Sequence, residues 1–530
     1  MELTQAGQFE IESAELFTST GNTINITNSV LEVNIYEDIY SNSMYGEISV
    51  VNTVGLVSSG PLIGQEYLSI VLKTPTLVDD KTKIKFDENI FHVIKVGRTI
   101  EGNGTEIVIL DFTTSELIHN QRTLVSRTLK GPFHEIVGTL LRTDLNCKKD
   151  LYIEQTNDVK TIIANNEHPF DIINQFLRSA TAVRHGQPSF VFYENFKGYH
   201  FRSLQSLYAE GSRFQYIETQ ANTTVGSASD PGLTGAKLNA KVTRDLATIL
   251  ATNISSSKDT ATSLSVGGLA SRLISHDIVQ KKYTVNNYNY LDDEDVLKQG
   301  LEILATEGEV KDFHQYNSGE VDDLGNRVSD FIPIQYLVPT ATVKNKNGIY
   351  KNAQYEVYNA KGDGTEYPYD PRRHEVTLQK RRSLMTNLEL GVTIELRANG
   401  QTTYGAGDLV SLDVKDFSKI DSNERDKRDK FLRGDWLVEA VRHTFNMNSQ
   451  THLMYVTLRK DSVDEELETA DHIEPKPVLF GELYSDEHFY GSVEGYDEKT
   501  GTRLPAPVKD DFQKRSATNR LGKLGRLQRF

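Results

Sequence analysis

The stretch WLVEAVRHTFNMNSQTHLMYVTLRK (436–460) contains two histidines, and imidazole nitrogens are common ligands of zinc and other transition metals. A hairpin with a loop of two or four residues centred on Met447-Asn448 places His443 opposite His452. The same register predicts three further pairs: Val441 with Met454, Leu437 with Leu458 and Thr444 with Thr451. A tetrahedral metal site needs a third and a fourth ligand, which the sequence does not supply. We therefore expect an ordinary cross-strand pair, with no metal and no cofactor.

Other residues of catalytic type lack the partners that their chemistry needs. His134-Glu135 has no second histidine at the spacing of a zinc-protease helix. No Gly-x-Ser-x-Gly nucleophile turn occurs, and no glycine-rich stretch matches a phosphate loop. The acidic run DDED at 292–295 is typical of a solvated surface. We therefore predict that there are no catalytic residues and that the protein is not an enzyme.

Arg433-Gly434-Asp435 matches a tripeptide that is often read as a cell-adhesion signal. It follows a charged run, SNERDKRDK (422–430), which is typical of an exposed loop, and it directly precedes a strand-like segment. A glycine is expected at such a turn for backbone reasons alone. We interpret the tripeptide as the turn that leads into a strand, and not as a receptor-binding site.

Length and composition limit the classes of protein to which this chain can belong. A chain of 530 residues is expected to divide into about three to five domains. No apolar run approaches the ~18 residues of a membrane helix and no secretory signal is visible, so we expect a cytoplasmic protein without membrane contact. The single cysteine, Cys147, excludes an internal disulfide framework. The net charge of −16 argues against general nucleic-acid binding.

Strand-rich and helix-containing segments alternate along the sequence, which predicts a mainly β fold with α+β parts. Residues 134–145 and 169–183 place apolar residues at helical spacing, and SFVFYENFKGYHFRSL (189–204) is hairpin-like. The predicted domains are a first β-barrel at 1–113, an α+β domain with two amphipathic helices at 114–216, a second β-barrel at 217–260 and 376–465, an inserted domain at 261–375, and a C-terminal extension at 466–530.

The first strand-rich segment ends in FHVIKVGRTIEGNGTEIVILDF (91–112), where a Gly-Asn-Gly turn indicates a hairpin. Laid without a gap over the stretch that begins at Trp436, it aligns the return strands IVILDF and HLMYVT. The apolar pairs in this overlay are Phe91 with Trp436, Val93 with Val438 and Val96 with Val441. A weaker match, IGQEYLSI (63–70) with AGDLVSL (406–412), precedes each hairpin. We infer an internal repeat of two related β-barrels, each ended by a barrel-closing hairpin.

Several of these stretches resemble the baseplate hub proteins of contractile-tailed phages (myoviruses), a group related to the hub part of type VI secretion spikes. The hairpin at 436–460 resembles that family's closing hairpin, and NIYEDIYSNSMYGEISVVNTVGLVSSGPLIGQEYLSI (34–70) resembles its first barrel. HPFDIINQFLRSA with PSFVFYENFKGYHFRSL resembles its second domain, and SVGGLASRLISHDIVQKKYTVNNYNY (265–290) resembles the start of its inserted domain. Together the similar stretches span most of residues 1–465.

The resemblance implies a structural virion protein of the tail baseplate, assembled in the host cytoplasm. Three chains with two barrels each would form a ring that meets the sixfold tail tube and seats the threefold central spike. The implied partners are two further copies of the chain, the central spike protein, tail tube or tube-initiator proteins, other baseplate (wedge) proteins, and the tape-measure protein and DNA in transit through a central channel. The alternatives are a tail-associated cell-wall hydrolase and a glycan-binding tail protein.

Beyond residue 465 the resemblance fades, and EPKP (474–477) begins an extension that ends in RLGKLGRLQRF (520–530). Basic and apolar residues there each recur at every third position, which on an extended backbone of about three residues per turn gives one basic and one apolar stripe. We predict either a disordered basic tail or an arm that docks on an acidic neighbouring subunit. The predicted arm residues are Lys514, Arg515, Arg520, Leu521, Lys523, Leu524, Arg526, Leu527, Arg529 and Phe530.

Overall fold

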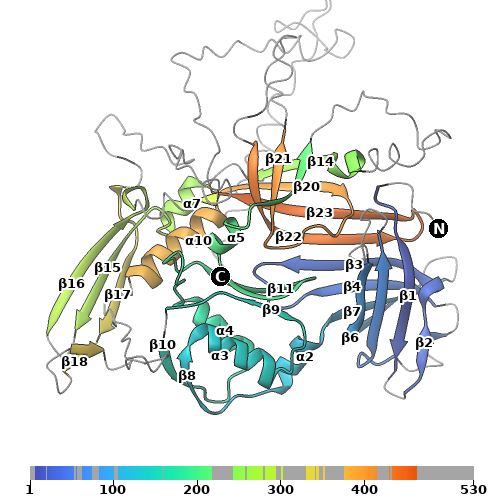
Figure 1. Ribbon diagram of the computed structural model, residues 1–530, viewed down its shortest axis with the longest axis horizontal. Helices are drawn as coiled ribbons and strands as arrows, with labels where there is room; N and C mark the ends of the chain where they lie inside the picture. The colour runs from blue at the N-terminus through green and yellow to red at the C-terminus, as the bar shows by residue number, and fades with distance from the viewer. Residues whose placement is uncertain are drawn as a thin grey trace, which may run out of the picture. The chain divides into compact units, whose positions relative to one another are not determined.

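Figure 1 shows the protein as a computed structural model that describes residues 6–461 with interruptions. The interruptions are 19–20, 53–54, 57–61, 75–82, 101–104, 158, 218–242, 257–258, 278–280, 294–299, 302–326, 328–329, 341, 345–349, 353–374, 415–428 and 430–431. The predicted C-terminal arm and the Gly-Asn-Gly turn at 102–104 lie outside the described residues. No helix in the described part of the chain is long and apolar enough to cross a membrane.

The first strand-rich segment forms strands whose side chains alternate between a core and solvent. In β4, Gly46, Ile48 and Val50 are buried while the residues between them are half-buried, as expected when one face of a strand covers a core. The spatial order of this first strand set is β3-β4-β7-β6-β5-β1-β2. The bounds are β1 Glu10–Phe17, β2 Thr23–Asn25, η1 Thr27–Ser29, β3 Val30–Asp38, β4 Tyr45–Val51, β5 Tyr67–Lys73, β6 Lys83–Ile100 and β7 Glu106–Thr114.

Strands from later in the chain form a second strand set in the order β14-β20-β23-β22-β21-β13. The bounds are β13 Ser212–Ile217, β14 Ile249–Ser256, β20 Val392–Asn399, β21 Leu409–Asp413, β22 Gly434–Asn446 and β23 Thr451–Lys460. Its core gathers around Trp436, which packs with Val438 and Leu458 and is fully buried. The indole N–H of Trp436 donates to the backbone oxygen of Leu432 at 2.9 Å, so the polar atom of this side chain is satisfied.

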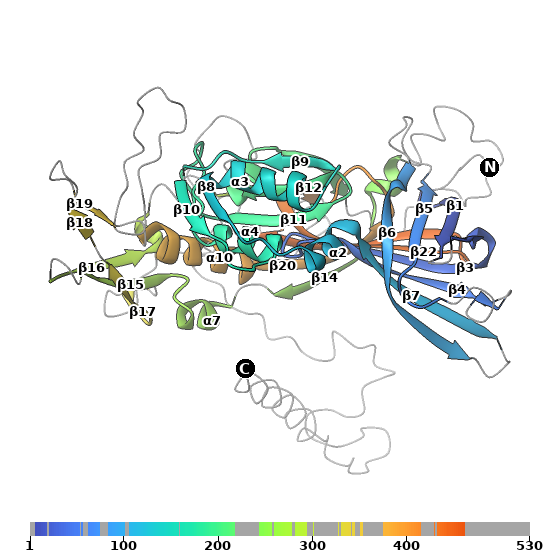
Figure 2. The same ribbon diagram turned by 90° about the horizontal axis from the view of Figure 1, so that it is seen from below.

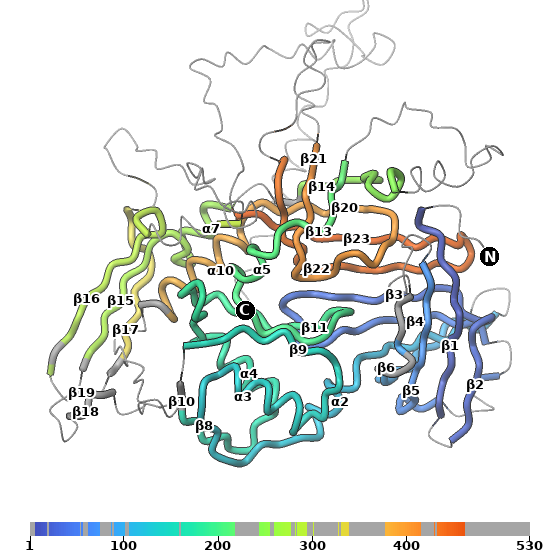
Figure 3. The backbone as a smooth tube through the Cα atoms, viewed as in Figure 1, coloured from blue at the N-terminus to red at the C-terminus, as the bar shows by residue number. Residues whose placement is uncertain are grey.

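The two strand sets are joined through β22. Residues Gly434–Leu437 pair with β21, and Ala440–Asn446 pair with β3 of the first set. Figure 3 traces β22 and β3 side by side, and the strands of both sets form one 13-stranded sheet. The mainly β class with α+β parts is confirmed.

No barrel closed by a full ladder occurs among the described strands, which instead form an open path from β14 to β2. β3 is the outer strand of the first set, and its free edge pairs with β22 of the second set. That edge of β3 is therefore not available to pair with the other end of its own set and close a barrel. In the second set, a single bridge between Ile217 and Thr248 links the region of β13 to the start of β14.

A helix-containing part packs around the small sheet of β11, β12 and β9. The helix predicted at 134–145 is present as α3 and the π-helical turn η3, and the helix predicted at 169–183 is present as α4. α4 ends six residues early, because Ala182 forms an extended bridge with Thr156. The bounds are α2 Ser115–Arg122, β8 Thr128–Pro132, α3 Phe133–Thr139, η3 Leu140–Asp144, β9 Asp150–Ile153, β10 Val159–Ile163, α4 Pro169–Leu177, β11 Phe190–Asn195, β12 Gly198–Ser203 and α5 Leu204–Tyr208.

The remaining described elements include a three-stranded sheet in the order β16-β15-β17 and the helical segment that leads back to β20. Their bounds are α7 Thr260–Ser265, β15 Ala270–Asp277, β16 Lys282–Asn289, η4 Tyr290–Asp292, β17 Gln335–Thr340, β18 Thr342–Lys344, β19 Tyr350–Asn352, η6 Glu375–Lys380 and α10 Arg381–Glu389. The domain boundaries given by the sequence stay a prediction.

Candidate functional site

The two hairpins singled out by the sequence occupy equivalent places in the two strand sets. In β6–β7 the register slips by one residue between Val93 and Lys95, and in β22–β23 it slips between Val438 and Ala440. Both slips are β-bulges at the same point of the hairpin. The strand orders β3-β4-β7-β6-β5-β1 and β14-β20-β23-β22-β21-β13 also correspond in position, although β1 is antiparallel to β5 whereas β13 is parallel to β21. The two strand sets therefore share one architecture.

The gapless overlay predicted from the sequence is correct in the first strand of the hairpin and wrong in the second. Val93 pairs with Phe112 and Val438 pairs with Leu458. Leu458, and not Thr457, is therefore the structural counterpart of Phe112. The second hairpin therefore has one more residue between Val438 and Leu458 than the first has between Val93 and Phe112. The overlay missed this residue because the spacing of apolar residues within the strands contains no information about the length of the loop.

The six hairpin residues chosen from the sequence belong to the cores of the two strand sets. The buried ones are Phe91, Val93, Trp436, Val438 and Val441, while Val96 is half-buried against the first core. Their burial explains why apolar types recur at these positions. A role for them in assembly stays a prediction.

A buried carboxylate turn precedes each hairpin. The backbone oxygen of Glu66 accepts a hydrogen bond from the N–H of Val93 at 2.8 Å, and that of Asp408 accepts one from Val438 at 2.9 Å. The Glu66 carboxylate accepts three backbone N–H groups of its own turn, at 2.7, 2.9 and 3.1 Å. The Asp408 carboxylate accepts the N–H of Gly405 at 2.9 Å. The weak sequence match between the two turns thus marks one structural position.

Three parts of the chain meet at the turn before β21, which the sequence did not indicate. Glu37 of β3 accepts the backbone N–H groups of Phe196 and Ala406, both at 2.8 Å. Burial raises the pKa of Glu37 to about 7. A Cβ at Gly405 would stand 2.5 Å from Oε2 of Glu37, so a larger residue here would displace this carboxylate. The two glycines of YGAGD (404–408) were the available sequence signal.

A second buried junction, formed by Lys149, Glu116 and Glu194, ties the helix-containing part to the first strand set. The Nζ of Lys149 contacts Glu116 at 2.6 Å and also contacts Glu194, and all three side chains are less than 9 % exposed. Glu194 further accepts the hydroxyl of Thr114 at 2.7 Å and the backbone N–H of Met44 at 3.0 Å. Burial opposes the charged form of Lys149, but the two carboxylates outweigh it and raise its pKa.

The two histidines meet, although in a different register from the predicted one. The loop holds four residues between Asn446 and Thr451, and the ladder sets Phe445 opposite His452 and His443 opposite Met454. The other three predicted pairs are wrong for the same reason, since the observed pairs are Val441 with Val456, Leu437 with Arg459 and Thr444 with Leu453. The loop is centred one residue later than predicted, which moves the partner of each residue by two positions, or by one position for Leu437 beyond the bulge.

The imidazoles of His443 and His452 contact each other diagonally, with Nδ1 of His443 3.1 Å from Nε2 of His452. Both rings are fully buried, and the outer nitrogens, Nε2 of His443 and Nδ1 of His452, have no hydrogen-bond partner among the described residues. Burial lowers the pKa of His443 to about 3 and that of His452 well below its ordinary value. In the described ranges, no group of three or more His, Cys, Asp or Glu side chains is placed to hold a metal ion.

The other residues of catalytic type make ordinary contacts. His134 lies 3.2 Å from the hydroxyl of Thr156, and burial lowers its pKa. Asp292 pairs with Arg327 at 3.0 Å and Asp293 with Lys380 at 3.1 Å, while residues 294–295 lie outside the described part. Gly434 has φ 108° at the start of β22, which is the turn into a strand expected for the Arg-Gly-Asp tripeptide.

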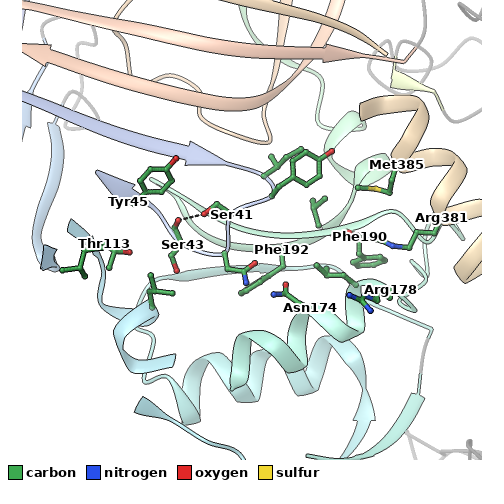
Figure 4. Close-up of a pocket in the computed structure, with 17 residues that line it drawn as sticks. Ser41, Ser43, Tyr45, Thr113, Asn174, Arg178, Phe190, Phe192, Arg381 and Met385 are labelled. Carbon is green, nitrogen blue, oxygen red and sulfur yellow. Dashed lines mark hydrogen bonds between the residues drawn. The ribbon is translucent and has the colours of Figure 1, made fainter. Parts of the chain in front are cut away.

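A cleft of about 770 Å³ lies between the β3–β4 turn, α4, β11 and α10 (Figure 4). Its 17 lining residues include Ser41, Tyr45, Phe192 and Met385, and none of them carries a carboxylate, an imidazole or a thiol. The guanidinium of Arg381 donates to the backbone oxygens of Pro188 and Phe190 at 2.8 and 3.2 Å. Because the cleft lacks a group that exchanges protons near neutral pH, its lining offers no general acid or base.

The described chain is thus a pair of like strand sets fused into one sheet, with a helix-containing part attached by two buried polar junctions. No family model and no curated protein matches the sequence.

Solved structures that are similar to this one include phage tail proteins and a type VI secretion protein. A tail protein from Neisseria meningitidis has a TM-score of 0.45 at 10 % identity, over 86 % of this chain and 97 % of that one. The 43 kDa tail protein of prophage MuSo2 from Shewanella oneidensis has a TM-score of 0.43 at 7 % identity, over 84 % and 97 %. A type VI secretion component from E. coli has a TM-score of 0.35 at 8 % identity, over 87 % and 79 %. At 7–10 % identity, these are similarities of fold.

Proposed function

We propose that the protein is a non-enzymatic structural component of a contractile phage tail, the baseplate hub that joins the tail tube to the central spike. The observation that carries the proposal is the repeated architecture. Two strand sets share their strand order, the bulge of their hairpin and the buried carboxylate turn before it, and pairing of β22 with β3 fuses them. The resemblance of the sequence to hub proteins supports the same function.

Duplication of this kind suits a part that must fit two symmetries. A trimer of this chain presents six like strand sets, so one face can contact a sixfold tube while the whole remains threefold for a spike. The proposed partners are the tube or tube-initiator proteins, the spike and the wedge proteins, with tape-measure protein and DNA passing through the channel. The net charge of −16 suits such a passage, because acidic surfaces repel phosphate.

The oligomeric state tests the proposal. We expect size-exclusion chromatography with light scattering to give three times the chain mass of 59.7 kDa, for the protein alone or after mixing with its spike protein. Measurement over a wide range of concentrations separates a weak trimer from a monomer, because association follows mass action. A strictly monomeric protein under both conditions contradicts the hub.

The arm at the C-terminus gives a second, independent test. Deletion of residues 508–530 is expected to weaken hub–spike or hub–tube assembly in pull-down measurements and to leave trimer formation unchanged. Replacing Arg520, Lys523, Arg526 and Arg529 by glutamine is expected to have the same effect, and the effect of charge is expected to fade at high salt. Unchanged assembly by the shortened chain would leave only the disordered tail.

A further inference from the structure

The pairing of β22 with β3, here called the seam, shows how two neighbouring strand sets make contact. The strands are antiparallel, with Thr444 opposite Asn34 and His443 opposite Ile35. The hydroxyl of Thr444 donates to Oδ1 of Asn34 at 2.9 Å. Phe445 and Ile35 are both 0 % exposed. The guanidinium of Arg442 donates to the same oxygen of Asn34 at 3.1 and 3.2 Å, and the amide of Asn446 donates to Glu32 at 3.2 Å. The seam thus combines a strand ladder, polar side-chain contacts and buried apolar side chains.

In the second set, β14 occupies the place that β3 occupies in the first. β3 pairs with β4 as β14 pairs with β20, at the same position in the strand order. The register slips between Val30 and Glu32 in one pairing and between Ile249 and Ala251 in the other. The two outer strands therefore share a bulge, which fixes their residue correspondence.

Counted from this bulge, Asn253 corresponds to Asn34 and Ile254 to Ile35. Each asparagine faces a glutamate of the next strand inward. The seam has two halves, the strand β3 with Asn34 and Ile35 and the strand β22 with Thr444 and Phe445. β14 therefore repeats the β3 half.

The other half of the seam is repeated in β6. Counted from the bulge that the two hairpins share, Thr99 corresponds to Thr444 and Ile100 to Phe445. β6 therefore repeats the threonine and apolar positions of the β22 half, with Gly97 and Arg98 in the places of Arg442 and His443, and it lies on a different strand set from β14.

Both repeated halves lie on strand edges that form no second ladder in the single chain, although Thr248, directly before β14, bridges to Ile217. Among the described strands, β14 forms a ladder only with β20, and Lys95–Ile100 of β6 forms one only with β7. Ile100 is 73 % exposed and Ile254 is 48 % exposed, whereas their counterparts Phe445 and Ile35 are 0 % exposed. Figure 2 shows the β6–β7 hairpin reaching past the strands beside it. Open edges with exposed apolar side chains are templates for pairing with another chain.

We propose that β6 of one copy pairs with β14 of a second copy in the register of the seam, with Thr99 opposite Asn253 and Arg98 opposite Ile254. The contact is head-to-tail, because each copy offers β6 at one edge and β14 at another, and such contacts close into rings or continue as filaments. On the proposed function, on which this step rests, the ring closes after three copies. Six like strand sets then alternate between seams within chains and seams between chains.

Single-cysteine variants test the register directly. Thr99→Cys and Asn253→Cys are purified separately, mixed, oxidised and run on a non-reducing gel. We expect a dimer band in the mixture and none with either variant alone, because only the β6–β14 contact brings the two thiols within the Cα separation of ~5.5 Å that a disulfide needs. The native Cys147 is buried, and burial raises its pKa to about 12, which keeps its thiol out of the reaction.

Two control experiments are needed, one that should form a disulfide and one that should not. Asn34→Cys with Thr444→Cys in one chain should form an intramolecular disulfide, because these residues already face each other in the seam. Val285→Cys, exposed on β16, should give no dimer with Thr99→Cys. A dimer formed by Thr99→Cys alone would indicate a head-to-head contact and overturn the proposal.

The chain with both Thr99→Cys and Asn253→Cys should give covalent dimer and trimer bands and nothing larger. A ladder of bands above the trimer would refute closure after three copies. A wild-type trimer by light scattering, together with no dimer in the cysteine mixture, would refute the repeated seam and leave the hub standing. A wild-type monomer would instead refute the hub itself.

Discussion

Lys149→Met is expected to lower the free energy of unfolding by about 3–5 kcal/mol, the range for removing one partner of a buried ion pair. The ammonium lies between the carboxylates of Glu116 and Glu194, and Glu194 is fully buried. Without the ammonium, both acids keep the desolvation cost of burial and repel each other. Methionine has a similar length and an adaptable side chain, so the loss reports the charge more than a cavity.

Chemical denaturation at pH 7, followed by circular dichroism, measures this loss. Lys148→Met is the matched control, since Lys148 is the exposed neighbour, and it should change stability by less than ~0.5 kcal/mol. Burial already raises the pKa of Glu194, so acidification toward pH 5 should restore part of the stability of Lys149→Met as the acid takes up a proton. Adding Glu194→Gln to Lys149→Met should also restore stability. Equal stabilities of the two lysine variants would show that the cluster contributes no net energy.

The hairpins were predictable from the sequence because the pattern that defines a hairpin lies within one short, continuous stretch of the chain. Each strand buries one face, so apolar residues occur at alternating positions. The same burial explains why Phe91 and Trp436 are both aromatic and why Val93 and Val438 are both valine. The register of the second hairpin was missed because it depends on the loop. Gln450 adopts φ 51°, and Asn446 accepts the backbone N–H of Ser449 at 3.1 Å, features of a four-residue loop that is centred one residue later.

The buried junctions were not predictable from local patterns. Glu116, Lys149 and Glu194 are far apart in the sequence, and each is of a residue type that is usually exposed. Nothing in the sequence near any one of them indicates that the fold buries the three together. The Glu37 junction likewise joins segments separated by hundreds of residues. Only the two glycines within residues 404–408 indicated that another part of the chain comes close to the backbone here. They did not indicate which part. The open edges of β6 and β14 became recognisable only when the register of both strand sets was known.

Acidification is expected to destabilise the protein through the buried pair His443–His452, by up to roughly 2–3 kcal/mol per pH unit below about pH 6. Burial keeps both rings neutral in the folded state, with the pKa of His443 lowered to about 3. In the unfolded chain a histidine has a pKa near ~6.5. The unfolded state therefore binds two protons that the folded state excludes, so stability is complete above about pH 7 and is lost as the pH falls toward 3.

Glu37 acts with the opposite sign. Its pKa of about 7 in the folded state, against an ordinary value of 4.5, means that between these values the folded protein holds a proton that the unfolded chain releases. Stability from this carboxyl therefore grows as the pH falls from about 7 toward 4.5, and it offsets about one histidine in that window. His200, whose pKa burial also lowers to about 3, acts with the same sign as the pair, so substitution is needed to isolate the contribution of His443 and His452.

Replacing both histidines by glutamine isolates their share, because the variant retains Glu37 and loses only the two imidazoles. The free energy of unfolding is measured in urea at pH 7, 6 and 5. His452 stacks on Phe445 with ring centroids 4.0 Å apart, so the variant loses some stability at every pH, and the slope against pH is the readout. We expect the variant to lose less stability on acidification than the wild type, with a slope that differs by up to roughly 2–3 kcal/mol per pH unit. Both proteins keep Glu37 and also His200, whose pKa burial lowers to about 3, so the difference in slope reports the two imidazoles alone. His276→Gln, at an exposed position of β15, should keep the wild-type slope, and a wild-type slope in the double variant would assign the acid sensitivity to other groups.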